Sequence, residues 1–94
     1  MTAPPSQPDL ADPAVVLATL GRLLAARGQR HLYGAADDRT GMAVLSVRDS
    51  TTVWIDTRAR LLRWPEDGTW VHWPLADLEG AAARLAAPPY PATR

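Results

Sequence analysis

Residues 63–74 read RWPEDGTWVHWP and place three of the four tryptophans of the 94-residue chain within ten positions. Apolar and polar residues alternate around a Pro-Glu-Asp-Gly sequence, in which proline presets the backbone for a turn and glycine accepts a left-handed conformation. This pattern predicts a β-hairpin with strands at 60–64 and 69–73 and a four-residue loop at 65–68. The spacing also determines which tryptophans face the core.

The hairpin and the turn before it determine which residues stand opposite one another, and opposed residues share one face of the sheet. A loop at 65–68 places Arg63 opposite Trp70, and a two-residue turn at Arg58-Ala59 places Trp54 opposite Arg63. The face that is predicted to form the core carries Leu45, Val47, Val53, Ile55, Leu62, Trp64, Val71 and Trp73. The opposite face, here called the open face, carries Trp54, Asp56, Leu61, Arg63, Trp70 and His72.

The candidate binding site lies on the open face and consists of Trp54, Leu61, Arg63, Trp70 and His72. In the predicted register, Trp54, Arg63 and Trp70 form one row, and an arginine between two indoles makes cation–π stacks of about 0.5–1 kcal/mol each when exposed. Asp56, Leu61 and His72 form the next row. A register shift of one residue would exchange the two faces, so the site depends on the turn assignments.

Three interpretations of the open face stay open. The row shields the sheet and binds nothing, or it is an interface for a protein partner or a second copy, or it binds a small ligand or single-stranded nucleic acid. The leading hypothesis is a non-enzymatic interaction module, because Trp and Arg contribute most strongly at protein interfaces. A free strand edge is a second surface through which the chain is able to dimerise.

The segments on either side of the strands predict two helices. Asp12 and Pro13 are typical of a helix start and Gly28 of a helix end, which gives a helix at 13–27. Its apolar positions recur at helical spacing and are Val16, Leu17, Leu20, Leu23 and Leu24. A second helix is predicted at 75–86, with Asp77 and Glu79 in its first turn.

The strands outside the hairpin are predicted at 30–34, 42–47 and 52–57, with a turn at 35–41 and another at 48–51. The predicted fold class is therefore α+β: a two-layer sandwich with an antiparallel sheet of four to five strands and both helices on one face.

The length allows a single α+β domain, predicted at 9–87. Residues 1–8 (MTAPPSQP) are predicted to be a disordered tail, and residues 88–94 (PPYPATR) form a proline-rich tail. No signal sequence and no apolar run of membrane-spanning length is seen, so we expect a cytoplasmic protein without a membrane partner.

The charge balance argues against a nucleic-acid partner, because ten acidic and ten basic residues leave no net positive field. The chain has no cysteine and only two histidines, His31 and His72, so neither a metal site nor a cofactor is expected. No nucleophile motif surrounds any serine. Asp56 and His72 are able to meet across Leu61, but a surface ion pair explains such a pair better than catalysis, so we do not expect an enzyme.

The order of these motifs resembles that of small uncharacterised actinobacterial proteins, over about residues 13–87. The matching segments are LGRLLAARG (20–28), His31 to Tyr33, Trp64 to Trp73, and DLEGAAARLA (77–86). The Pro-Glu-Asp-Gly turn is clearer here than that pattern requires. The resemblance implies a bacterial cytoplasmic setting and an accessory role beside a regulator, and it implies no activity.

Overall fold

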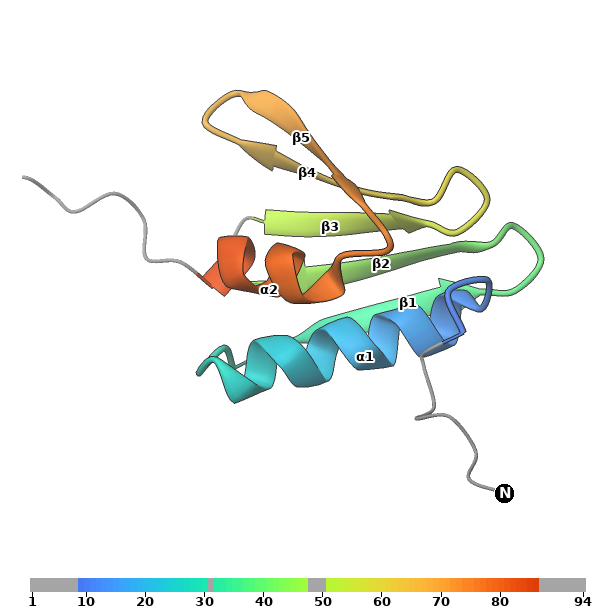
Figure 1. Cartoon of the computed structure of the whole chain (residues 1–94), viewed down its shortest axis with the longest axis horizontal. Helices are drawn as coiled ribbons and strands as arrows, with labels where there is room; N and C mark the ends of the chain where they lie inside the picture. The colour runs from blue at the N-terminus through green and yellow to red at the C-terminus, as the bar shows by residue number, and fades with distance from the viewer. Residues whose placement is uncertain (1–8, 31, 48–50, 87–94) are drawn as a thin grey trace, which may run out of the picture.

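The computed structural model of the chain describes residues 9–30, 32–47 and 51–86. The elements are α1 (Pro13–Ala26), β1 (Tyr33–Asp37), β2 (Met42–Val47), β3 (Thr51–Asp56), β4 (Leu61–Glu66), β5 (Thr69–Pro74) and α2 (Leu78–Ala86). The five strands form one antiparallel sheet in which each strand pairs with its neighbour in sequence (Figure 1). The predicted α+β architecture is confirmed, whereas the predicted tails and most of the turn at 48–51 lie outside the described residues.

The core lies between the two helices and the face of the sheet that they cover. Residues alternate between buried and less buried along β2, and the buried positions of β2, β3 and β4 are those predicted from the sequence, with Ala43 added. The strand residues of the core are Ala43, Leu45, Val47, Val53, Ile55, Leu62 and Trp64, with Val71 and Trp73 packed against them. Both helices contribute to this same cluster, which confirms that they cover one face.

Helix α1 begins and ends as its sequence predicts. The Asp12 side chain accepts a hydrogen bond from the Ala14 N–H at 3.0 Å, and Pro13 occupies the first helical position. At the other end, Gly28 adopts a φ of 90°, and the N–H of Gln29 donates to the Leu24 carbonyl at 3.0 Å. This Schellman arrangement ends the helix at Ala26, one residue earlier than predicted.

Helix α2 begins at Leu78, three residues later than predicted, because Asp77 caps it instead of standing in its first turn. The Asp77 Oδ1 atom accepts from the Gly80 N–H at 3.0 Å, and the Asp77 carbonyl accepts from the Ala81 N–H at 3.1 Å. Only Glu79 of the two predicted acidic residues lies in the first turn. The Leu75 N–H bonds the Arg60 carbonyl at 3.0 Å, which holds the segment before α2 against the β3–β4 loop.

Strand β1 occupies Tyr33–Asp37, so the prediction of a strand at 30–34 followed by a turn at 35–41 is wrong. The turn begins only after Asp37, whose side chain accepts from the Arg39 N–H at 2.9 Å and whose carbonyl accepts from the Gly41 N–H at 3.0 Å. Ala35 and Ala36 therefore pair with β2. The two aspartates of the segment suggested an earlier turn, but one aspartate is sufficient to form it.

The β4–β5 hairpin turns at Asp67-Gly68, so the predicted four-residue loop is wrong. Asp67 has a φ of 52° and Gly68 a φ of 80°, and two successive positive φ angles define a type I′ turn, whose twist matches the flanking strands. Pro65 lies inside β4 opposite Trp70. The register is shifted by two residues from the predicted one, and because side chains alternate with a period of two, every residue keeps its predicted face.

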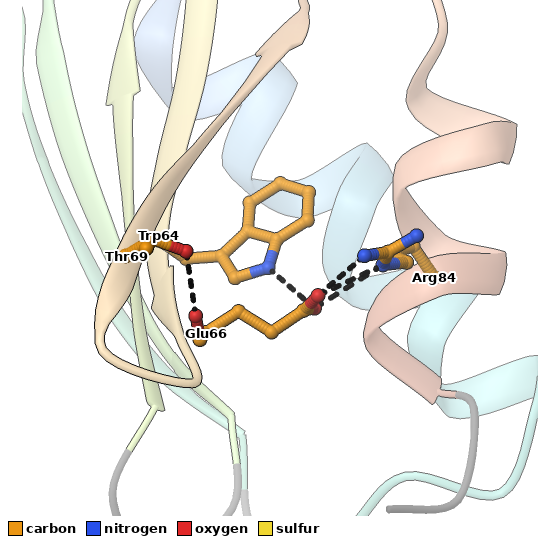
Figure 2. A network of polar contacts seen from close by, with 4 residues as sticks. All are labelled: Trp64, Glu66, Thr69 and Arg84. Carbon is orange, nitrogen blue, oxygen red and sulfur yellow. Dashed lines mark hydrogen bonds and ion pairs between the residues drawn. The ribbon is translucent and has the colours of Figure 1, made fainter. Parts of the chain in front are cut away.

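A polar network joins the hairpin to α2 beside the buried indole of Trp64 (Figure 2). The Trp64 Nε1–H donates to Glu66 Oε2 at 3.4 Å, and the Arg84 Nε–H donates to both carboxylate oxygens of Glu66 at 3.2 Å. The Thr69 hydroxyl donates to the Glu66 carbonyl at 3.0 Å. Glu66 therefore connects the hairpin to the last turn of α2.

We predict opposite effects for two glycine-to-alanine substitutions. An added Cβ meets no atom within 4 Å at either Gly68 or Gly21, but only Gly68 has a positive φ. Gly68→Ala should lower the free energy of unfolding by about 1–2 kcal/mol, because L-residues are strained there. Gly21→Ala, inside α1, should raise it by about 0.5–1 kcal/mol. Urea unfolding of both variants checks this, and equal losses would contradict the assignment of strain to the turn.

A double-mutant cycle should show that Glu66 and Arg84 stabilise the fold jointly. With Glu66→Gln and Arg84→Gln, we expect a coupling of about 1 kcal/mol in urea unfolding, because two guanidinium nitrogens contact one carboxylate. The matched control is Asp56 with Arg63, an ion pair of 3.8 Å that should couple by only about 0.3 kcal/mol. Coupling energies of equal size in the two cycles would contradict this ranking.

Candidate functional site

The exposed large hydrophobic side chains of the described residues gather on the open face. They are Tyr33, Trp54 and Trp70, which are 72%, 42% and 56% exposed. Trp64, in contrast, is 1% exposed under the helices. Two tryptophans therefore lie on each side of the sheet in the way the sequence predicted. Tyr33 is not among the predicted site residues, because the strand predicted at 30–34 had no predicted partner strand that would assign its faces.

The open face holds a pocket of about 340 Å³ on β3, β4 and β5, lined by Trp54, Arg63, Trp70 and His72. Trp54 stands opposite Arg63 as predicted, whereas Arg63 stands opposite His72 and not opposite Trp70. Trp70 lies two residues along β5 from His72, nearer the hairpin turn. The pocket thus brings together four of the five predicted site residues, although the order of their rows differs from the prediction.

Leu61, the fifth predicted site residue, lies outside the pocket lining. It stands opposite Asp56 of β3 and opposite Pro74 of β5. The row across the three strands is therefore Asp56, Leu61 and Pro74, and His72 is not in it. The predicted approach of Asp56 and His72 across Leu61 is therefore wrong. Leu61 is half-buried and extends the same face beside the pocket.

Arg63 makes an ion pair with Asp56 in place of the predicted stack between two indoles. Arg63 Nη2 lies 3.8 Å from Asp56 Oδ2. The other carboxylate oxygen of Asp56 accepts from the Arg58 and Ala59 N–H groups at 3.1 and 3.0 Å, which orders the β3–β4 turn. One carboxylate therefore orders the turn and also pairs with the guanidinium of Arg63.

The indole N–H groups divide the tryptophans into two classes. Those of Trp64 and Trp73 are bonded, since Trp64 donates to Glu66 and Trp73 donates to the Asp77 carbonyl at 3.0 Å. Within the described part of the chain, no hydrogen bond engages the indole N–H of Trp54 or Trp70. The two indoles at the pocket therefore retain donors that a ligand is able to use.

Pro65 ends the pairing between β3 and β4 on one side of the pocket. The last paired residues are Trp54 and Arg63, and Pro65, two positions beyond Arg63, has no N–H to continue the ladder. In Figure 1 the β4–β5 hairpin diverges from β3 toward its turn. Trp70 stands opposite Pro65 on this diverging part of the hairpin and lines the pocket from there.

Neither a metal site nor a membrane-spanning helix is found among the residues that the structure describes. Across 9–30, 32–47 and 51–86, no three His, Cys, Asp or Glu side chains lie together in a way that would hold a metal ion. Neither α1 nor α2 is long and apolar enough to cross a membrane.

No family model, no curated protein and no solved structure matches the chain. The pocket is therefore the main candidate for a functional site among the described residues.

Tryptophan fluorescence should separate the two classes of indole. The double substitution Trp54→Phe with Trp70→Phe leaves only the indoles on the helix side, so we expect a blue-shifted emission and weaker quenching by acrylamide. Trp64→Phe, the matched control, removes a buried indole and should shift the emission to the red. If the double variant is quenched as strongly as the wild type, the exposed positions have been assigned to the wrong face.

Proposed function

We propose that the chain is a non-enzymatic interaction module whose open face binds protein, either a second copy or another chain. The single observation that supports it is the pocket, which combines two exposed indoles, an arginine and a histidine on a face that no described element covers. Aromatic and arginine side chains are enriched at the centres of protein interfaces. Burial of Trp54 and Trp70 against a partner would remove apolar surface from water and engage their unbonded N–H groups.

The electrostatics favour protein over nucleic acid as the partner. The chain has no net charge, and the arginine that lines the pocket, Arg63, is paired with Asp56 at 3.8 Å. Phosphate binding would need positive charge that is free to replace counterions along a strand. A cytoplasmic setting and an accessory role beside a regulator, as the sequence resemblance implies, are part of this proposal.

The second candidate is a small ligand or a short single strand of nucleic acid in the same pocket. The volume of about 340 Å³ favours it, because small-molecule sites begin at about 300 Å³. Indoles also stack on bases, and Arg63 and His72 are able to contact a phosphate. Salt separates the two candidates, since phosphate contacts weaken steeply with salt and apolar contacts do not.

Self-association is the form of the proposal that is testable without a known partner. We expect light scattering after size exclusion to give a mass above the monomer for the wild type and a monomer mass for Trp70→Ala. The physical reason is the loss of the largest exposed apolar group of the pocket. Arg22→Ala, on the exposed side of α1 and away from the open face, is the control and should keep the wild-type mass.

A higher mass that survives Trp70→Ala would place the interface elsewhere, for example at the β1 edge. Folded monomers in both samples would exclude self-association through this face. Binding of an oligonucleotide whose affinity falls steeply between 50 and 200 mM salt would support the second candidate instead.

A further inference from the structure

We infer that the pocket receives the proline-rich segment Pro88-Pro89-Tyr90-Pro91 of a second copy of the chain. The inference rests on the proposed function, because it names the occupant of the same pocket. The segment follows α2 in the sequence and lies outside the described residues. Four observations support this occupant: the donors of the pocket, the chemistry of proline, the spacing of the indoles and the position of the end of α2.

The pocket is rich in hydrogen-bond donors and lacks carboxylates. Each of its four lining residues carries N–H groups: the indoles of Trp54 and Trp70, the guanidinium of Arg63 and the imidazole of His72. The nearest carboxylate, Asp56, is engaged by Arg63 and by the β3–β4 turn. A complementary ligand therefore offers apolar surface and hydrogen-bond acceptors but few donors.

Proline-rich segments have this chemistry. Proline has a backbone carbonyl that accepts and no N–H that donates, and its ring presents a flat apolar surface to an aromatic face. In the polyproline II conformation the carbonyls point outward and little entropy is lost on binding, which is why aromatic-lined grooves recognise such segments. Pro88 to Pro91 is a run of four apolar residues, whereas the N-terminal pair Pro4-Pro5 is followed by polar Ser6 and Gln7.

The spacing of the two indoles suits a segment of this length. Trp54 and Trp70 are separated by two strand spacings and by two residues along the strand, so their Cα atoms are about 12 Å apart. Four residues of polyproline II span about 9 Å between their first and last Cα atoms, and the side chains extend this span. One segment of four residues is therefore able to contact both indoles.

The end of α2 indicates that the occupant comes from another copy. Arg84 contacts Glu66 on the helix side of the hairpin (Figure 2), and the pocket opens on the other side of the sheet. Only one residue separates Ala86 from Pro88 in the sequence, so a segment that occupied its own pocket would have to pass from the helix side around the edge of the sheet within a few residues. A segment from a second copy is not limited by this connection.

The test follows the four indole N–H resonances of the full chain by nuclear magnetic resonance. In the wild type, the resonances of Trp54 and Trp70 should shift on dilution and those of Trp64 and Trp73 should not, since the latter are bonded within the fold. A variant with all four residues of Pro88 to Pro91 changed to serine should lose this shift and resemble the dilute wild type. Its dissociation constant for self-association should rise at least tenfold.

The control is Pro4→Ser with Pro5→Ser, which should behave as the wild type. If Trp70→Ala abolishes association but the tail variant still associates, this inference is overturned and the proposed function stands. If neither change affects association, both fail. A tail variant that shifts the Trp54 and Trp70 resonances equally at every concentration would show docking within one copy, which also overturns the inference.

Discussion

The buried ring of Trp64 is the point at which the hairpin, the sheet and the second helix meet. It packs 5.9 Å from the ring of Trp73, centroid to centroid, and its N–H is bonded to Glu66, which in turn pairs with Arg84 of α2. The indole is 1% exposed and belongs to the same core cluster as Leu78, Ala82 and Leu85 of α2, so the helix and the ring lie on one side of the sheet. With that side fixed, the alternation of the strands assigns every other side chain to the core or to the open face.

The open face is a consequence of the same alternation. Two helices cover one side of a five-stranded sheet, and in the described part of the chain no element covers the other. Surface sheets commonly carry polar residues on the uncovered side, yet this one carries Tyr33, Trp54 and Trp70. The indoles inside are bonded within the fold, whereas those of Trp54 and Trp70 outside have no hydrogen bond among the described residues, which supports the proposal of an interaction surface.

Pro65 and the Asp67-Gly68 turn together give the pocket its form. The type I′ turn sets the pairing of β4 with β5, and the missing N–H of Pro65 ends the pairing of β4 with β3. Near the turn, β4 therefore pairs with β5 but no longer with β3. This end of the hairpin diverges from β3 and carries Trp70 with it (Figure 1). A residue with an N–H at position 65 would be able to extend the ladder toward Thr52 and flatten this part of the face.

The sequence alone determined the fold class, the helix caps at Asp12 and Gly28, and the face on which each tryptophan lies. These features depend on local periodicity and on short-range hydrogen bonds, which the order of residues specifies. Only the tertiary structure decided that His72, and not Trp70, stands opposite Arg63, and that Asp56 holds that arginine. The two possible hairpin loops differ by two residues and give the same alternation, so periodicity cannot choose between them. The choice depends on the positive φ angles of Asp67 and Gly68, which form the two-residue turn, and on the pairing of Leu61 with Pro74 at the other end of the hairpin.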